Sequence, residues 1–442
     1  MTHSWVGIVA AAIGLGVMIL VHEWGHFIVA RLCGVRVEVF SIGFGNRIFG
    51  WKRGNTDYRI SVFPLGGYVK MAGDNPSEER SGSPDEFLAR PRWQRVLIVL
   101  AGPVMNGVLA IALMWGLYMA GIPIARYMQQ PAQIAGVIPG SVADKAGLKP
   151  GDKIVSINGT AVSTWNEALS DSGVVPGMTL SLDVERNGAV IPVREDVPKN
   201  AVDYSDLLGY PMSGKVVVDS VQPGFPAAKQ GLQAGDEILS ANGVEHPNPA
   251  VLAYMIRSSG GKPVQLKIER SGKQQTLNVD PTFGNPDGTS KRWVVGALFG
   301  AGDMVRHSFT FTESAAQAWN FNASMVKEII RVFGGLFSGS VSIKDLAGPV
   351  GIVKISTEAA KNGAADFISF MAFLSLNLGI VNLLPIPIMD GGHIVVFAIE
   401  GALRRDLSVA MKERFVAIGL VFLLALLAFV TYNDVVLRVL NR

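Results

Sequence analysis

Long apolar runs alternate with mixed stretches along this chain and set its organisation. Four runs are rich in Ala, Ile, Leu, Val and Phe and carry few charged side chains, at residues 5–20, 96–120, 367–384 and 414–432. About 20 apolar residues in a helix span the hydrocarbon core of a bilayer. The pattern therefore predicts four transmembrane helices, which we place within residues 1–30, 96–120, 367–393 and 414–435. The first run resembles a signal-peptide core, but no small-residue cleavage site precedes residue 22, so we predict a retained helix.

Residues 31–95, between the first two runs, carry a strand-like alternation. The segments VRVEVFSIGFG and TDYRISVFPLGGYVKM alternate β-branched or aromatic residues with polar ones and are bounded by Gly and Pro. This pattern is typical of a hairpin or a small sheet. Strand backbone beside a membrane must pair internally or line a cavity. We expect a membrane-associated β region whose edge could take up an extended peptide; the alternative is a loop that never contacts substrate.

The region between the second and third runs contains a repeat. Gly151-Asp152 recurs as Gly235-Asp236, and Asn158-Gly159 recurs as Asn242-Gly243, both at a spacing of 84. The shared pattern of turn, short helix, glycine turn, strand and Asn-Gly hairpin predicts two tandem α+β domains, at about residues 127–205 and 206–285. They resemble PDZ domains, which commonly take an extended peptide onto a sheet edge. The alternative is a steric cap without a ligand.

Residues 303–361 follow the repeat and contain a helical pattern with an apolar face, in TESAAQAWNFNASMVKEIIRVFGGLF. An amphipathic helix lying in the membrane interface fits this pattern. A helix in the core of a soluble subdomain is the alternative.

Composition supports a membrane protein with soluble parts. Of the 442 residues, 49% are hydrophobic and 17% are charged, which is too apolar for an ordinary soluble protein of this size. The net charge of +3 is too small to indicate a nucleic-acid partner. The single cysteine, Cys33, excludes an intrachain disulfide.

The first apolar run ends in the sequence HEWGH, at residues 22–26. His22 and His26 are one helical turn apart, so they can place two imidazoles on one zinc ion with Glu23 beside them as general base. Ionisable groups at the end of a membrane helix are costly and mark a functional site. The alternative is a pair of interfacial histidines next to a glutamate at the membrane surface.

The third run ends in NLLPIPIMDGGH, at residues 382–393. Two prolines break a helix, and broken helices at membrane depth mark binding sites. Asn382, Asp390 and His393 are then held together on a kinked backbone, and Asp390 and His393 both remain candidates for a third zinc ligand. Asn106 in the second run, with Gly102 one turn before it, either approaches the metal or belongs to a plain packing face.

Basic residues predict the orientation of the chain. Residues 31–95 carry eleven Lys and Arg, and the stretch before the last run carries Arg404, Arg405, Lys412 and Arg414. Both should face the cytoplasm. The long repeat region is then extracytoplasmic, and HEWGH and NLLPIPIMDGGH lie toward the same side of the membrane.

Together HEWGH, GPVMN and NLLPIPIMDGGH, enclosing two PDZ-like domains, resemble the site-2 protease family of intramembrane zinc metalloproteases, in its bacterial regulator-of-sigma-E branch. The resemblance implies Zn²⁺ held by His22, His26 and Asp390, with Glu23 as base. It also implies substrate handling by Asn377 and Asn382. Met389 stands where Leu is commoner in the family.

The resemblance further implies a multi-pass protein of the bacterial inner membrane with its PDZ-like domains on the periplasmic side. The expected reaction is cleavage of transmembrane segments of single-pass membrane proteins, such as a pre-trimmed anti-sigma factor or remnant signal peptides. The competing hypothesis is a membrane scaffold with a structural zinc site, in which His393 is the fourth ligand. A zinc transporter fits poorly, because only one pair of the predicted helices carries polar groups and no acidic or His-lined path crosses the bilayer.

Overall fold

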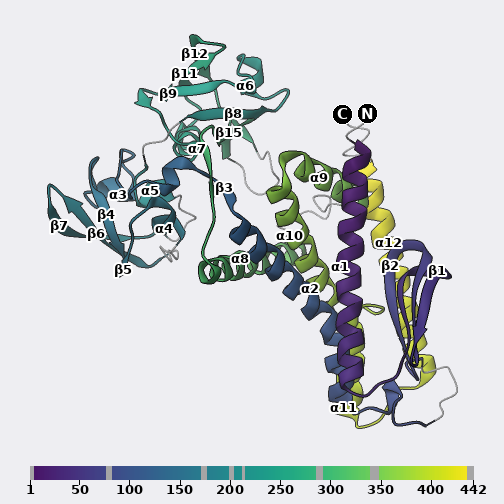
Figure 1. Ribbon diagram of the computed structural model, residues 1–442. Coiled ribbons are helices and arrows are strands. Elements are labelled where there is room, and N and C mark those ends of the chain that lie inside the picture. The colour runs from purple at the N-terminus through teal and green to yellow at the C-terminus, as the bar shows by residue number, and fades with distance from the viewer. Residues whose placement is uncertain are drawn as a thin grey trace. The chain divides into compact units, whose positions relative to one another are not determined.

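The computed structural model describes residues 4–75, 82–170, 177–198, 204–211, 215–284, 292–338 and 348–435. The chain forms two compact units. The first joins Met1–Ile122 to Ser308–Arg442, and the second is Pro123–His307. The first unit therefore contains all four apolar runs, and the second contains the repeat (Figure 1).

Four helices in the described part of the chain are long and apolar enough to cross a membrane. They are α1 (Ser4–Leu32), α2 (Arg92–Ala120), α10 (Ala364–Asn382) and α12 (Val409–Val435). The expectation of four spans is confirmed.

Small residues bring three of these helices into close contact. A β-carbon at Gly25 of α1 would lie 2.8 Å from the backbone carbon of Ala101 in α2. A β-carbon at Gly379 of α10 would lie 2.9 Å from the carbonyl oxygen of Pro103, also in α2. Close backbone approach at small residues is the usual way in which membrane helices pack. Helix α2 packs against both α1 and α10 and is the central helix of the three.

The third apolar run does not continue as one helix to residue 393. Helix α10 ends at Asn382, and a separate helix, α11 (Asp390–Leu403), begins after a turn that contains Pro385 and Pro387. Proline lacks the N–H that a helix interior needs. In the same turn Ile388 has a positive φ of 83°. The predicted span of 367–393 therefore covers nearly all of α10, a turn and the start of α11, and Asp390 begins a helix.

Two strands, β1 (Val37–Arg53) and β2 (Thr56–Met71), form a sheet against α1. Val39 pairs with both Asp57 and Lys70, so the first half of β1 lies between the two halves of β2. The last segment of β2, residues 67–71, pairs only with residues 37–42 in the register of this sheet. Among the residues that the structure describes, its other edge has no strand partner, and this edge borders the site described below.

Two further helices complete the first unit, α8 (Phe311–Ser338) and α9 (Pro349–Asn362). Helix α8 packs on α2 and buries Ala318 and Ile329, whereas Trp319 and Ile330 are exposed. It therefore has both an apolar packing side and exposed apolar residues. Helix α9 receives a cap from the last span, because Asp434 of α12 accepts a hydrogen bond from the backbone N–H of Gly351 at 2.9 Å.

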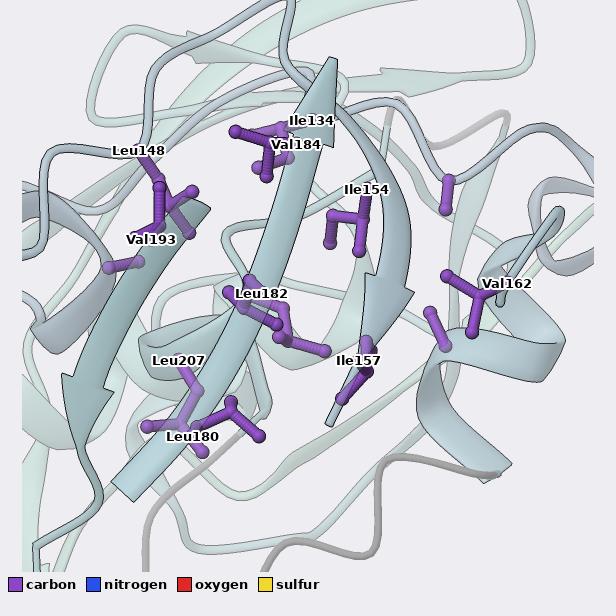
Figure 2. Packing of buried hydrophobic residues seen from close by; sticks show 14 of the residues in the cluster. Ile134, Leu148, Ile154, Ile157, Val162, Leu180, Leu182, Val184, Val193 and Leu207 are labelled. Atoms are coloured by element: carbon purple, nitrogen blue, oxygen red, sulfur yellow. The ribbon is translucent and has the colours of Figure 1, made fainter. Parts of the chain in front are cut away.

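The second unit contains two lobes that correspond to the two copies of the repeat. The first lobe has a four-stranded antiparallel sheet in the order β5-β4-β6-β7. Its elements are α3 (Val142–Lys145), β4 (Lys153–Ile157), β5 (Thr160–Ala161), α4 (Trp165–Ser170), β6 (Thr179–Arg186), β7 (Ala189–Asp196) and α5 (Tyr204–Leu207). Figure 2 shows its core, where Ile154, Leu182 and Val184 lie among other buried aliphatic side chains.

The second lobe repeats this arrangement and extends it, with the strand order β12-β11-β9-β8-β15. Its elements are β8 (Val216–Val221), α6 (Pro226–Lys229), β9 (Glu237–Ala241), β10 (Val244–Glu245), α7 (Pro249–Ser258), β11 (Val264–Arg270), β12 (Lys273–Val279), β13 (Thr282–Gly284), β14 (Arg292–Val294) and β15 (Ala297–Ala301). Strand β16 (Met304–His307) pairs with β3 (Ile122–Ala125).

A matching ion pair shows that the two lobes are copies in detail. Arg186 donates from Nε to the Asp152 carboxylate at 2.6 Å, and Arg270 donates to Asp236 in the same way at 2.6 Å. Both carboxylates are buried at 1% exposure. Burial alone would raise the pKa of each carboxyl, but the hydrogen bonds from its arginine and from a backbone N–H outweigh burial and hold the pKa below its ordinary value.

Candidate metal centre

Two imidazoles on one turn of α1 face a common point. His22 and His26 are four residues apart, which places them on one face of the helix. Their Nε2 atoms lie 3.2 Å from each other. Both residues are buried, with 7% and 8% of their surface exposed. The helix runs unbroken from Ser4 to Leu32, so its backbone fixes this spacing.

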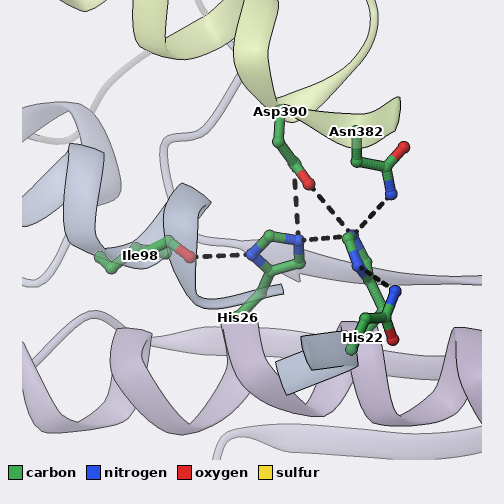
Figure 3. Close-up of polar contacts among 6 residues, drawn as sticks. His22, His26, Ile98, Asn382 and Asp390 are labelled. Carbon is green, nitrogen blue, oxygen red and sulfur yellow. Dashed lines mark hydrogen bonds and ion pairs between the residues drawn. The ribbon is translucent and has the colours of Figure 1, made fainter. Parts of the chain in front are cut away.

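Asp390 joins the two histidines from the far end of the sequence. Its Oδ2 lies 3.1 Å from Nε2 of His22, and its Oδ1 lies 3.6 Å from Nε2 of His26. In Figure 3 the carboxylate points from the start of α11 toward both rings. Ligand atoms of the three residues all lie within 4.8 Å of one another, which is the geometry of a group that could hold a metal ion.

The ring of His26 is held by the backbone of α2. Its Nδ1 lies 2.8 Å from the carbonyl oxygen of Ile98. A carbonyl oxygen can only accept a hydrogen bond, so Nδ1 carries the proton and donates it. In the neutral ring the lone pair is then on Nε2, which points at the carboxylate of Asp390.

The ring of His22 lies next to the side chain of Asn106, which is fully buried. The Nδ2 of Asn106 lies 3.3 Å from Nδ1 of His22, while its Oδ1 has no hydrogen-bond partner among the residues that the structure describes. The two ends of an amide are assigned by their hydrogen bonds. Turning the amide over pairs Oδ1 with an N–H at Nδ1 of His22. That tautomer leaves the lone pair of His22 on Nε2 as well.

These residues fit a zinc ion. Two Nε2 lone pairs and a carboxylate converge with no proton left between them, an arrangement that a cation would stabilise. Zinc prefers imidazole and carboxylate ligands, and catalytic zinc sites use three protein ligands and leave one position open. The hydrogen bonds to Ile98 and Asn106 are the outer contacts that commonly orient zinc-bound histidines.

Glu23 lies beside this group, in a cavity of about 540 Å³ that also contains His22, His26 and Asp390. The free edge of β2 forms one wall of the cavity, at residues 66–69. The backbone N–H of Val69 hydrogen bonds to the Glu23 carboxylate. A β-carbon at Gly67 would lie 3.1 Å from Cγ of Glu23. Glycine at this position therefore lets the strand approach the glutamate closely.

Of the remaining candidate residues, two line this cavity and one does not. Asn382 and His393 both line it, and Nδ2 of Asn382 lies 3.4 Å from Nε2 of His22. His393 is outside the group whose ligand atoms lie within 4.8 Å, so Asp390 is the third member of the cluster. Asn377 lies earlier on α10 and does not line this cavity.

Sequence reasoning identified some of the groups that form the site and missed others. Of the two interpretations for Gly102 and Asn106, proximity to the metal centre is confirmed. A β-carbon at residue 102 would lie 2.8 Å from Cε1 of His22. Sequence reasoning missed the carbonyl of Ile98 and the N–H of Val69. Nearly every residue type carries these backbone groups, so the sequence does not show where they take part in a site.

The sequence is similar to one peptidase family and to several proteins that are named as proteases. The sequence profile of peptidase family M50 matches residues 10–426. The regulator of sigma-E protease RseP of Escherichia coli K12 is 32% identical, with 96% of each chain covered. The regulator of sigma E protease of Haemophilus influenzae is also 32% identical, over 96% of this chain and 97% of that protein. A Neisseria meningitidis protein named as a predicted zinc metalloprotease is 31% identical, over 95% of this chain and 96% of that protein.

Proposed function

This chain belongs to peptidase family M50, the site-2 proteases, and from that premise we propose that it hydrolyses peptide bonds inside the membrane-spanning segments of other proteins. It is a zinc metalloprotease and a multi-pass protein of the inner membrane. One observation carries the proposal: the Nε2 atoms of His22 and His26 and the carboxylate of Asp390 converge next to Glu23, in a cavity bordered by the candidate membrane-spanning helices α1 and α10.

In this proposal His22, His26 and Asp390 hold the zinc ion. Zinc in such a site supplies Lewis acidity, which polarises the scissile carbonyl and makes a water molecule easier to deprotonate. His22 and His26 are buried and the side chain of Asp390 is only 17% exposed, and electrostatic interactions are stronger in such surroundings than in bulk water.

Glu23 is the general base. It follows His22 directly on α1, so its carboxylate is held next to the cluster and inside the same cavity. It takes the proton from the attacking water and later passes it to the amine that leaves. Asn382 has its amide at the same cavity wall, 3.4 Å from His22, and donates to the oxygen that becomes negative in the transition state. We assign Asn377 to substrate handling farther along α10.

The free edge of β2 is proposed to unwind the substrate. An amide inside a helix is shielded by its own hydrogen bonds, so the helix must open locally before hydrolysis. Residues 67–71 of β2 present toward the cavity an edge that has no strand partner in the described part of the chain, although the N–H of Val69 already contacts Glu23. An extended segment added to that edge gains strand hydrogen bonds in exchange for the helical ones. Its scissile bond then lies near Glu23.

The substrate class follows from the family and from the relatives. Two relatives are named as regulators of sigma E, so we propose that single-pass membrane proteins of the anti-sigma factor type, already trimmed outside, are substrates, together with remnant signal peptides. The two repeat lobes are proposed to be PDZ domains on the periplasmic side. They either bind the exposed ends of such substrates or exclude bulky ones.

Three variants test this proposal with two measurements, cleavage of a co-expressed reporter segment and zinc content of the purified full chain. Glu23→Gln should abolish cleavage and keep one zinc per chain. His22→Ala should lose both. His393→Ala should keep its zinc, because His393 lies outside the cluster. Cleavage by Glu23→Gln would overturn the mechanism. Loss of zinc in His393→Ala would favour a closed structural site and a scaffold.

A further inference from the structure

A second cavity in the first unit, of about 1020 Å³, lies at the end of the α1 span. It is bounded by the last turns of α1, the start of β1, the turn between β1 and β2, and the loop at residue 85. None of the residues that line it also lines the metal-centre cavity. The hydrolytic mechanism above gives it no role.

This cavity carries more positive than negative charge. Arg31, Arg36 and Arg53 line it, and Asp85 is its acidic member. Arg36 is paired with Asp85, with Nε 3.3 Å from Oδ2. In the described part of the chain neither Arg31 nor Arg53 has a carboxylate within 4.0 Å, and both are exposed. Arg31 lies over the ring of Phe27, 5.8 Å from its centroid. Two guanidinium groups therefore remain available to an anion.

One side of the wall, formed by the last turns of α1, is apolar, whereas Asn55 and Asp85 line the opposite side together with the arginines. Phe27, Ile28 and Leu32 line the cavity from α1, and Leu32 is 81% exposed although it belongs to the candidate span. On the β1 side, Trp51 is 57% exposed and stacks on Tyr58, with 5.7 Å between ring centroids. Tryptophan and tyrosine are enriched at the boundary between hydrocarbon and water. The cavity therefore places positive charge next to apolar surface, as the boundary between lipid headgroups and acyl chains does.

We propose that this cavity binds the phosphodiester headgroup of an anionic membrane phospholipid. Arg31 and Arg53 hold the phosphate, because guanidinium matches phosphate oxygens in a bidentate manner. The acyl chains lie along Phe27, Ile28 and Leu32. Basic pockets at the ends of membrane helices are suited to such headgroups. A soluble phosphate compound shares the charge but would leave the apolar wall exposed to water, and for that reason we assign the lipid.

A bound lipid would also connect two parts of the enzyme. Arg31 is on α1, five residues after His26, and Arg53 is at the turn of the sheet whose edge borders Glu23. One headgroup held by both side chains ties that turn to the end of α1. The site does not depend on peptide hydrolysis, so it can be tested by binding alone.

The test is native mass spectrometry of the purified full chain, titrated with phosphatidylglycerol or with phosphatidylcholine of the same acyl chains. We expect tighter binding of phosphatidylglycerol. Arg31→Gln combined with Arg53→Gln should weaken it roughly thirtyfold, since each basic residue near anionic lipid contributes about fivefold in affinity. Arg31→Lys with Arg53→Lys keeps both charges but loses the bidentate contacts, so its affinity should lie between those of the unaltered chain and the glutamine pair.

The matched control removes two cations that do not line the cavity, by Lys52→Gln with Arg405→Gln, and should change the affinity less than the test pair. Zinc content of each variant reports whether the first unit is still folded. Equal weakening in the test and control pairs would overturn the proposal, as would equal affinity for the two lipids. Inorganic phosphate alone binding as tightly as phosphatidylglycerol would also overturn it, because the apolar wall would then contribute nothing.

Discussion

Gly102 of α2 lies directly against the imidazole of His26, so a β-carbon at residue 102 would overlap Nε2 of that ring. The same β-carbon would lie 2.8 Å from Cε1 of His22. The space that the two rings need is therefore provided by a missing side chain on the neighbouring helix. The close packing of α1 on α2 therefore also determines the geometry of the metal centre.

Gly102→Ala should consequently remove zinc and cleavage together, while the protein still inserts and folds. The added methyl group pushes Nε2 of His26 away from the point where it meets Asp390. Zinc content and reporter cleavage measure the effect, and we expect at least a tenfold loss of zinc affinity, the size of the effect when outer contacts of a zinc site are disturbed.

Gly107→Ala is the matched control for that variant. It lies on the same helix, and a β-carbon there would meet nothing within 4 Å. It should keep zinc and activity, and alanine should if anything favour the helix. Equal loss of zinc in the two variants would show that α2 tolerates no added methyl group, and would contradict the specific role of Gly102.

Asn106 should orient His22 rather than bind the metal. Asn106→Ala removes the partner of Nδ1, so we expect zinc affinity to fall by about 10- to 100-fold. Asn106→Asp offers an acceptor in the same place and should retain more zinc than the alanine variant. The zinc affinity of both variants is measured by competition with a chelator.

Ser375→Ala is the control for Asn106. The Ser375 hydroxyl donates to the backbone carbonyl of Asn106 at 2.9 Å and does not touch its amide. Removing it loosens the contact between α10 and α2 without freeing His22. If Ser375→Ala lowers zinc affinity as much as Asn106→Ala, helix packing is the cause and the orienting role is wrong.

The sequence predicted the parts of this site that local geometry determines. Helical spacing alone fixes His22 and His26 on one face, and the structure has them there. Asp390 could not be reached in this way, because its distance from α1 depends on how α2 and α10 pack, and periodicity does not encode that. The family resemblance selected it over His393, and the cluster geometry agrees.

Backbone effects account for the parts that the sequence did not predict. The two prolines predicted the break after α10, but the positive φ of Ile388 and the start of a separate helix, α11, at Asp390 were not predicted. The four-segment arrangement of β1 and β2 depends on several register shifts. Alternation shows which residues form strands but not where a long strand folds back on itself.

Glu400 should anchor the last span. It is fully buried in α11, and its Oε1 accepts hydrogen bonds from Lys412 Nζ of α12 at 2.7 Å and from the backbone N–H of Leu407 at 3.0 Å. Arg95 of α2 lies 3.9 Å from Oε2. Removing one partner of a buried ion pair leaves the others uncompensated, which costs about 3–5 kcal/mol. Glu400→Gln should destabilise the full chain by that amount in thermal unfolding.

The nearby pair of Arg92 and Asp406 provides the control for Glu400. It has a similar geometry, at 3.0 Å, but both side chains are at least one-third exposed. Exposed pairs contribute about 0–1 kcal/mol. Asp406→Asn should therefore change stability little. A similar loss in both variants would mean that burial of Glu400 is not what holds α12.

Glu195 should make the stability of the first repeat lobe depend on pH. It lies on β7 at 4% exposure, and within the described ranges of the chain neither carboxylate oxygen has a hydrogen-bond partner. Burial, with a smaller contribution from the negative charge of Asp206, raises the pKa of Glu195 from 4.5 to about 8. The folded lobe therefore keeps a proton that the unfolded chain releases near pH 4.5.

The sign follows from this difference in bound protons. Between about pH 4.5 and about pH 8 the unfolded chain binds fewer protons than the folded lobe, so stability falls as pH rises through this window. At 1.36 kcal/mol per pKa unit, the loss is at most about 5 kcal/mol. Glu195→Gln should remove this slope and make the lobe more stable at the alkaline end. Trp165, which is buried in the same lobe, provides the probe, through fluorine NMR of fluorotryptophan in the full chain.

Glu185→Gln is the matched control, because Glu185 lies on the adjacent strand β6 and is only partly buried. It should leave the pH slope of unfolding as it is in the unaltered chain. Asp206→Asn should shift the upper end of the window to lower pH, since it removes the like charge that contributes to the pKa of Glu195. A slope that persists in Glu195→Gln would assign the titration to another group and contradict the role of this carboxyl.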